Sequence, residues 1–323
     1  MKESKNISKI NPTTSNQPQQ AKAAKLPIDG VLLIDKPLGL SSNQILQRVK
    51  RLFNAKKAGH TGALDPLASG MLPICFGKAT KFAQYLLDAD KHYTAEATLG
   101  IMTDSGDMDG EVIQRRPVGK ISDDALAMVL DKFKGDIQQV PPMHSALKHK
   151  GQPLYKLARK GIKVDRPPRD VKIFQLDLLD RTENTLLIDV ICSKGTYIRT
   201  LVQDIGKALL CGATVSMLRR VNVGTFKNYP MFTLDYLEQV QAEQGQAGLE
   251  KLLLPISVAI AGLPELTISE TEWLYLKNGR SFKPVPSQAP GFVKLKLYTG
   301  QMLGVGDVDE KGMLNTNQLI HRR

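Results

Sequence analysis

The order of the apolar segments is the feature that most restricts the fold of this chain. Runs typical of strands and runs typical of helices follow one another irregularly, without the strand–helix–strand rhythm of a parallel sheet. Val31-Leu32-Leu33-Ile34 predicts a buried strand, and Ser41 and Gln44 have capping-box spacing before an amphipathic helix. This order favours an α+β domain with a mixed, largely antiparallel sheet and flanking helices.

Changes in composition divide the chain into three segments. Residues 1–26 are polar and rich in Ser, Asn, Gln and Lys, so we predict a disordered tail. Residues 27–250 hold most of the predicted strands and helices. Prolines become frequent after residue 250, and Phe292–Tyr298 and Met302–Val308 flank a Thr-Gly turn as a predicted hairpin. We therefore expect residues 251–323 to form a small β-rich domain.

The charge of the chain points to an acidic partner. Lys and Arg number 44 against 32 Asp and Glu, which gives a net charge of +12. Nucleic acid is the leading candidate, because each neutralised phosphate releases counterions and strengthens binding. The stretch Pro141–Lys172 is especially basic, with Asp165 and Asp170 as its acids. It is expected to position phosphates, and the alternatives are a mobile solvated loop here and a generic basic protein overall.

Several classes of protein are disfavoured. No apolar run approaches the roughly 20 residues that span a bilayer, and the start of the chain has neither a secretory apolar core nor an early arginine. Cys75, Cys192 and Cys211 are odd in number and form no CxxC pair, which argues against disulfides and zinc. Thr103–Gly110 imitates part of a calcium loop but lacks key carboxylates, so it predicts a hairpin tip. We expect a reduced, cytoplasmic protein without a metal.

The segment Gly59–Gly70 contains the residue most suited to chemistry, Asp65. Two glycines and Pro66 lie so close together that a loop is expected there. A carboxylate is a useful nucleophile when it is held in fixed geometry and shielded from water, and a loop pinned by proline can hold it so. From spacing alone, an Asp that caps a turn is the commoner case. The segment lacks the GK[ST] of a phosphate-binding loop.

Several segments together resemble the TruB family of pseudouridine synthases, the bacterial tRNA pseudouridine-55 synthases. Gly59-His60-Thr61-Gly62-Ala63-Leu64-Asp65-Pro66-Leu67-Ala68-Ser69-Gly70 is similar to the active-site segment of that family. Further similar segments are Gly30–Pro37 with Ser41-Ser42, Ala79–Phe82, Lys91–Tyr93, Pro141–Ala146 and Ser193–Thr200. They cover the predicted main domain, whereas the match of the C-terminal part rests on position, length and β-rich pattern.

The resemblance implies a function. Asp65 would attack a flipped uridine at position 55, in the T arm of tRNA; the C–N bond breaks, the base rotates and a C–C bond forms at C5. No metal or organic cofactor is implied, and the attacked atom stays open between C1′ of the ribose and C6 of the base. Residues 251–323 would be the small RNA-binding β domain called PUA, and we expect a monomer that binds the T stem-loop.

The resemblance also implies roles for other residues. Tyr93 would stack on the uracil and serve as a base late in the reaction, and Arg199 would pair with Asp65 and keep it ionised. A core-facing strand tyrosine and a solvated helix arginine are the plainer interpretations. Smaller roles fall to residues that line the pocket, enter the RNA stack or meet phosphates: Tyr197 and Leu218, His60, and Lys36 and Lys81, respectively. An exposed histidine and solvated lysines are the alternatives.

Two other functions compete with this one. An RNA-binding or RNA-folding protein could keep the fold without the chemistry, but its signature would be a substituted aspartate, and Asp65, Tyr93 and Arg199 are all present. A glycosidase would need a second carboxylate as acid, and no such pairing is evident in the sequence. Loss of tRNA binding with salt would favour the RNA-dependent functions.

Overall fold

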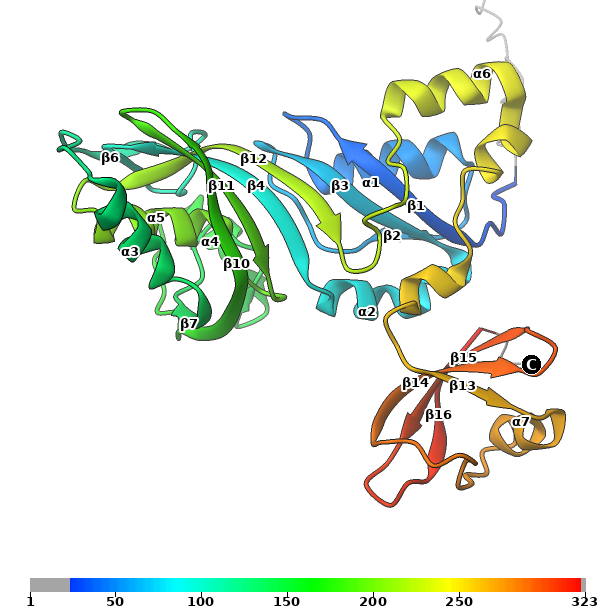
Figure 1. Cartoon of the computed structure of the whole chain (residues 1–323). Helices are drawn as coiled ribbons and strands as arrows, with labels where there is room; N and C mark the ends of the chain where they lie inside the picture. The colour runs from blue at the N-terminus through cyan, green and yellow to red at the C-terminus, as the bar shows by residue number, and fades with distance from the viewer. Residues whose placement is uncertain (1–23, 321–323) are drawn as a thin grey trace, which may run out of the picture.

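The computed structural model describes residues 24–320. The predicted tail lies outside the described residues as far as residue 23, and at its end Leu26 already forms a bridge with Ala55. The described chain builds two main sheets, a large one in the main domain and a small one in the C-terminal domain beneath it, together with two short two-stranded hairpins (Figure 1). None of the helices between residues 24 and 320 is both long and apolar enough to cross a membrane.

The large sheet has eight strands in the order β1-β3-β12-β4-β11-β10-β7, with β2 paired to β3. The β3–β12 pair is parallel and the other pairs are antiparallel, which confirms the predicted mixed, largely antiparallel sheet. The strands are β1 (Gly30–Lys36), β2 (Ala58–His60), β3 (Ala68–Phe76), β4 (Lys91–Leu99), β7 (Gly135–Gln139), β10 (Arg169–Arg181), β11 (Thr185–Cys192) and β12 (Ala213–Val223).

Helices flank this sheet, and local sequence signals explain where several begin. The capping box of Ser41 and Gln44 starts α1, and the Ser122 side chain accepts from the Ala125 amide at the start of α3. A 3-10 turn, Gly77–Phe82, precedes α2. The helices are α1 (Ser42–Leu52), α2 (Ala83–Asp88), α3 (Asp123–Asp131), α4 (Leu154–Ala158), α5 (Ile198–Ala208) and α6 (Leu234–Glu250).

Two short hairpins complete the main domain. The first, β5 (Ile101–Thr103) with β6 (Val112–Arg115), makes the acidic segment the predicted hairpin tip. The second, β8 (Lys148–His149) with β9 (Gln152–Pro153), leads into α4 within the basic stretch. The loop expected from Gly59 onward starts later, because Ala58–His60 pairs with the end of β3.

Alternating residues of the central strands build the core of the main domain. On β4 the odd-numbered side chains from Tyr93 to Leu99 are buried, and Leu201 and Ile205 of α5 belong to the same apolar cluster. The other half of the sheet buries Leu32 and Ile34 beside α1 and α6. Because a strand presents successive side chains to opposite faces, this alternation fixes which side of β4 Tyr93 occupies.

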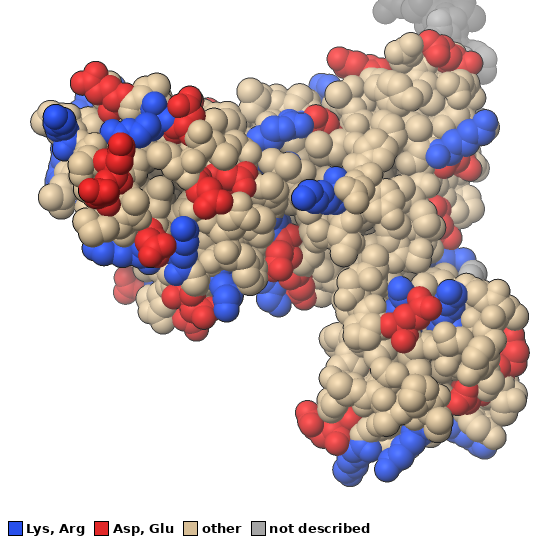
Figure 2. All heavy atoms as spheres, viewed as in Figure 1, with Lys and Arg blue, Asp and Glu red and all other residues tan. Residues whose placement is uncertain are grey.

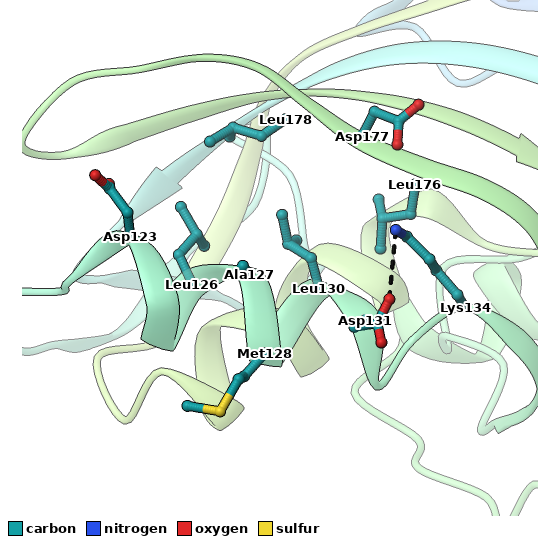
Figure 3. Close-up of a pocket in the computed structure, with 10 residues that line it drawn as sticks. All are labelled: Asp123, Leu126, Ala127, Met128, Leu130, Asp131, Lys134, Leu176, Asp177 and Leu178. Carbon is teal, nitrogen blue, oxygen red and sulfur yellow. Dashed lines mark ion pairs between the residues drawn. The ribbon is translucent and has the colours of Figure 1, made fainter.

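The packing of α3 on β10 leaves a groove of about 590 Å³. Figure 3 shows apolar side chains of both elements, among them Leu126, Leu130 and Leu178, with the ion pair of Asp131 and Lys134 at its edge. None of its lining residues belongs to the loop of Asp65. The chemistry of the side chains, and not the depth of the hollow, therefore locates the candidate site.

The C-terminal domain is a four-stranded sheet in the order β13-β14-β15-β16 with one helix. Its elements are β13 (Glu265–Ile268), α7 (Glu270–Lys277), β14 (Gly291–Leu297), β15 (Met302–Val308) and β16 (Leu314–Leu319). The predicted hairpin corresponds to the antiparallel pair β14–β15. Tyr85 of α2 meets the Phe292 ring edge-on at 5.8 Å between centroids, so the two domains are in contact.

The residues just after the predicted domain boundary at residue 250 still pack against the main domain. Leu254 exchanges two backbone hydrogen bonds with Val31 of β1, and a 3-10 turn, Ile256–Ile260, buries apolar side chains in the cluster that contains Phe82. Proline spacing signalled a change of rhythm, but these apolar residues need the surface of the main domain. We propose that the second domain begins near Pro264.

Gly70 lies where β3 approaches β12 closely, and its substitution tests whether the sheet requires this close approach. Its φ is +97°, and a Cβ there would lie 2.3 Å from the Arg220 carbonyl oxygen. We expect Gly70→Ala to lower the free energy of unfolding by about 3 kcal/mol or more, measured by urea unfolding. Gly135→Ala is the matched control, with a φ of +83° and open space around it, and should cost about 1–2 kcal/mol. Equal losses would contradict the close approach.

Candidate active site

Asp65 lies in the loop between β2 and β3, and buried side chains hold the backbone of this loop. The Ser42 hydroxyl accepts from the Leu64 amide at 2.7 Å and donates to the Leu64 carbonyl at 3.0 Å. Arg220 Nη2 donates to the Gly62 carbonyl at 2.9 Å. Since these bonds lie on the N-terminal side of Asp65, they fix the direction from which its carboxyl enters the site.

Lys36 holds the other side of the same loop, and this corrects the prediction that it meets phosphates. Its side chain is fully buried, and its ammonium donates to the carbonyls of Ala68 at 2.6 Å and Pro66 at 3.4 Å. Burial lowers its pKa to about 8, although the nearby Asp65 opposes the shift. A lysine without exposed surface cannot bind an RNA backbone, so its role in this structure is to hold the loop.

Arg199 forms the central contact of the site. It is the second residue of α5, its side chain is 7% exposed, and its Nη2 lies 2.9 Å from Asp65 Oδ2. Its Nη1 lies 3.2 Å from Asp107 Oδ2. The structure thus brings together the two residues that the resemblance paired, and it buries the arginine that the alternative interpretation left in solvent.

Arg199 also joins two segments that sequence analysis did not place at the site. It donates to the carbonyls of Ser105 at 2.8 Å and His144 at 2.7 Å. Asp107 and Ser105 belong to the β5–β6 hairpin tip, and His144 lies near the start of the basic stretch. The acidic run at the tip was the available signal for Asp107, but its pairing with Arg199 depends on contacts between residues far apart in the chain.

The environment of Asp65 favours its neutral form more than bulk water does. Burial raises the pKa of its carboxyl, and the attraction of Arg199 opposes this without cancelling it. The side chain is still 45% exposed, so the carboxyl has lost part of its hydration but remains open to a substrate. A carboxylate that is accessible, oriented and incompletely hydrated is suited to nucleophilic attack.

Tyr93, Leu218 and Leu64 belong to one apolar cluster, and Tyr93 lies near enough to Asp65 for the carboxyl to affect its hydroxyl. Tyr93 is buried on β4, and burial raises the pKa of its hydroxyl. Leu218 pairs with Ala68 through the parallel β3–β12 contact. The three side chains offer an apolar surface next to Asp65, which suits the face of a base.

Tyr197 and His60 occupy the borders of the site. Tyr197 caps α5, its amide donates to Gln139 Oε1 at 3.0 Å, and burial raises the pKa of its hydroxyl. His60 ends β2, and burial together with Arg220 lowers its pKa, so its imidazole is neutral near pH 7. Both are half-buried, and His60 differs in this from its exposed alternative.

Lys81, predicted to bind substrate, is exposed and makes its contacts with the C-terminal domain. Its ammonium donates to the Leu319 carbonyl at 2.9 Å and to the Ile320 carbonyl at 3.5 Å. It therefore ties the 3-10 turn before α2 to the end of β16. The sequence could not reveal this, because the partners are separated by more than two hundred residues.

Potential metal ligands do not gather in the described part of the chain. Between residues 24 and 320 no three His, Cys, Asp or Glu side chains lie close enough to hold an ion. The thiols of Cys75, Cys192 and Cys211 are free and buried. The candidate site thus consists of the Asp65 carboxyl, the Arg199 guanidinium and the apolar side chains of Tyr93, Leu218 and Leu64, which we call the apolar wall.

Asp65→Asn tests the electrostatic state of the site through stability. A carboxyl whose pKa is raised by folding stabilises the fold at low pH, and this stabilisation is lost as pH rises through the raised pKa. At pH 7 we therefore expect Asp65→Asn to leave Tm unchanged or raise it by up to about 2 °C, with no difference near pH 3. Asp309→Asn should lower Tm at pH 7, because backbone hydrogen bonds lower the pKa of Asp309. A clearly lower Tm of Asp65→Asn at pH 7 would mean that the attraction of Arg199 outweighs the effect of burial on the Asp65 carboxyl.

Comparisons with known proteins agree with this geometry. Residues 50–198 match the TruB family pseudouridylate synthase (N terminal domain), and residues 199–261 match the tRNA pseudouridylate synthase B C-terminal domain. A protein of Coxiella burnetii named tRNA pseudouridine synthase B is 47% identical over 96% of this chain and 100% of its own. Its namesake in Pseudomonas fluorescens is 48% identical over 93% of this chain and 98% of its own.

Solved structures support the fold. A chain in a Cbf5-Nop10-Gar1 complex superposes with a TM-score of 0.71 and 26% identity, over 95% of this chain and 93% of that chain. A chain in an archaeal box H/ACA sRNP Nop10-Cbf5 complex gives a TM-score of 0.69 at 24% identity, over 92% and 88% respectively. With family matches along most of the main domain and near-half identity to full-length relatives, the chain belongs to the TruB family of pseudouridylate synthases.

Proposed function

We propose that this chain converts a uridine of tRNA into pseudouridine, with Asp65 as the nucleophile. The observation that carries the proposal is the accessible Asp65 carboxyl, held 2.9 Å from the buried Arg199 guanidinium in a loop whose backbone is fixed on both sides. The relatives that match almost the whole chain are named for this activity.

The reaction needs few groups because it is an isomerisation. The bond from C1′ moves from N1 to C5 of the same base, the proton of C5 leaves and N1 gains one, so no electrons are gained or lost overall. Asp65 supplies the transient bond, at C1′ of the ribose or at C6 of the base. Arg199 orients the carboxylate and favours its charged form, which is the nucleophile.

The apolar wall would hold the base during this exchange. A uridine must leave its stack to reach Asp65, which costs a few kcal/mol. Stacking on Tyr93 and contact with Leu218 offset part of that cost, and the neutral ring of His60 is placed to fill the gap in the RNA. We assign the substrate to uridine 55 in the T arm on the strength of family resemblance.

Phosphate contacts would come from the basic stretch and the C-terminal domain. On the face shown in Figure 2, Lys and Arg alternate with Asp and Glu, so a continuous basic surface is not found there. Pro141–Lys172 holds nine Lys and Arg against two Asp, and His144 within it contacts Arg199. We propose a cytoplasmic monomer in which this stretch and the PUA-like domain grip the T stem-loop.

The two competing functions fit the site less well. A pure RNA-binding protein has no use for a carboxylate whose pKa is raised beside a buried arginine. A glycosidase needs a second carboxyl that donates a proton. Asp107 is the neighbour available, but it is buried and paired with the same guanidinium as Asp65, so it is not free to act as an acid.

Pseudouridine formation in unmodified tRNA tests the nucleophile. Asp65→Asn should lower the rate at least about 1,000-fold, since an amide cannot form the transient bond, while tRNA affinity is kept. Asp123→Asn, a highly exposed carboxyl on α3, is the matched control and should be fully active. Activity retained in Asp65→Asn would reduce Asp65 to a turn residue, and binding by an inactive wild type would favour the RNA-binding protein.

The salt dependence of tRNA binding tests the basic stretch. Each phosphate contact contributes about 0.7–0.9 to the slope of log affinity against log salt. Lys160→Gln with Lys163→Gln should therefore reduce the slope by about 1.5, whereas Lys134→Gln, just after α3, should leave it unchanged. An unaltered slope in the double variant would remove this stretch from the RNA interface.

A further inference from the structure

Arg220 is a buried cation that takes no part in the reaction steps proposed above. It lies on β12, is 1% exposed, and is among the largest fully buried side chains of the described chain. Between residues 24 and 320 no carboxylate lies within ion-pair distance of its guanidinium. A buried charge without a counter-ion is costly, so its position requires an explanation.

The contacts of Arg220 connect the nucleophile loop to Tyr93. Its Nε donates to the Met71 carbonyl at 2.7 Å, and its Nη2 donates to the Gly62 carbonyl at 2.9 Å, three residues before Asp65. In the sheet register it stands opposite Tyr93 on one side and Gly70 on the other. The guanidinium also lies close to the Tyr93 side chain, and it opposes the rise in the pKa of the Tyr93 hydroxyl that burial causes.

The loop of Asp65 comes close to the Arg220 guanidinium at Gly62. A Cβ on Gly62 would lie 3.3 Å from Arg220 Nη1, and the φ of Gly62 is +76°. Glycine at this position lets the cation lie directly against the loop. Burial lowers the pKa of Lys36 and His60, and the charge of Arg220 acts in the same direction on both.

The geometry points to Arg220 as a positioning residue that directs the Tyr93 hydroxyl toward the uracil and favours its ionised form. This inference rests on the proposed function and names a group that the family resemblance did not supply. Because Arg220 is almost fully buried, it does not reach the base itself, so it acts through Tyr93 and through the loop of Asp65.

The chemistry explains why a cation belongs there. After the new bond forms at C5, the C5–H bond must break, and its electron pair returns to the ring. The proton can pass to the ionised oxygen of Tyr93, which becomes a neutral phenol and later releases the proton to water. Burial alone disfavours the ionised phenol, and the adjacent guanidinium offsets part of that penalty without supplying a proton itself.

A purely structural role makes a different prediction, and the two can be separated. If Arg220 only holds the Gly62 and Met71 carbonyls, its substitution should slow the reaction by the same factor whether or not Tyr93 has a hydroxyl. If it acts through Tyr93, the two substitutions should be coupled, because removing either group removes the same interaction.

The variants are Arg220→Lys, which keeps a charge but loses the planar fork, Tyr93→Phe, and both together. Arg219→Met is the matched control: it precedes Arg220 on the same strand, is 39% exposed and pairs with Asp35. Single-turnover rates of pseudouridine formation report the chemical step, and filter binding reports tRNA affinity.

We expect Arg220→Lys to slow the single-turnover rate about 10- to 100-fold, the size of one lost charge-assisted hydrogen bond. Affinity for tRNA should change less than about threefold. In the Tyr93→Phe background, the further effect of Arg220→Lys should shrink to about threefold or less. Equal effects in both backgrounds, or a rate unchanged by Arg220→Lys, would overturn the proposal.

A spectroscopic measurement separates failure of this inference from failure of the proposed function. In protein labelled with ¹³C at tyrosine Cζ, the signal of Tyr93 is the one missing in Tyr93→Phe. It should move in Arg220→Lys and stay in place in Arg219→Met, because the Cζ shift reports hydrogen bonding at the hydroxyl. If the Tyr93 signal stays in place in folded Arg220→Lys, the inference is overturned. If that signal moves but the wild-type protein forms no pseudouridine, only the proposed function is overturned.

Discussion

The shared guanidinium of Arg199 is the interaction on which the arrangement of the site depends. It pairs with Asp65 and Asp107 and donates to two backbone carbonyls, so four segments of the chain meet at one side chain. A buried arginine of this kind is stable only when its donors are satisfied together. The β5–β6 hairpin and the start of the basic stretch are therefore held by the same cation that orients the nucleophile.

The sheet makes this meeting possible by placing distant segments in register. The parallel contact of β12 with β3 puts Leu218 beside Ala68 and Arg220 beside Gly70, while the antiparallel contact with β4 puts Arg220 opposite Tyr93. The loop that follows β2 opens next to this junction, and α5 packs over the same side of β4. The candidate site is thus located where the single parallel pair of the large sheet adjoins its antiparallel part.

Local signals explain which features could be predicted. The capping box of Ser41, the alternation along β4 and the hairpin β14–β15 depend on neighbours in sequence, and the fold class followed from them. Lys36, Lys81 and Asp107 depend on contacts across the chain. A lysine next to a strand has the same local pattern whether its ammonium faces water or three carbonyls, so Lys36 was assigned to phosphates. We propose a later domain boundary than the prolines indicated for a similar reason, because packing depends on contacts across the chain.

The cations behind the loop suggest why an exposed nucleophile needs buried lysine and arginine side chains. The carbonyls of Gly62, Pro66 and Ala68 flank Asp65 in sequence, and each accepts from Lys36 or Arg220. The buried cations thus satisfy the carbonyls around the nucleophile, and Lys36 also attracts the Asp65 carboxyl. The remaining burial still raises the pKa of Asp65, so the loop keeps a reactive carboxylate at some cost in stability, as sites with fixed charge geometry generally do.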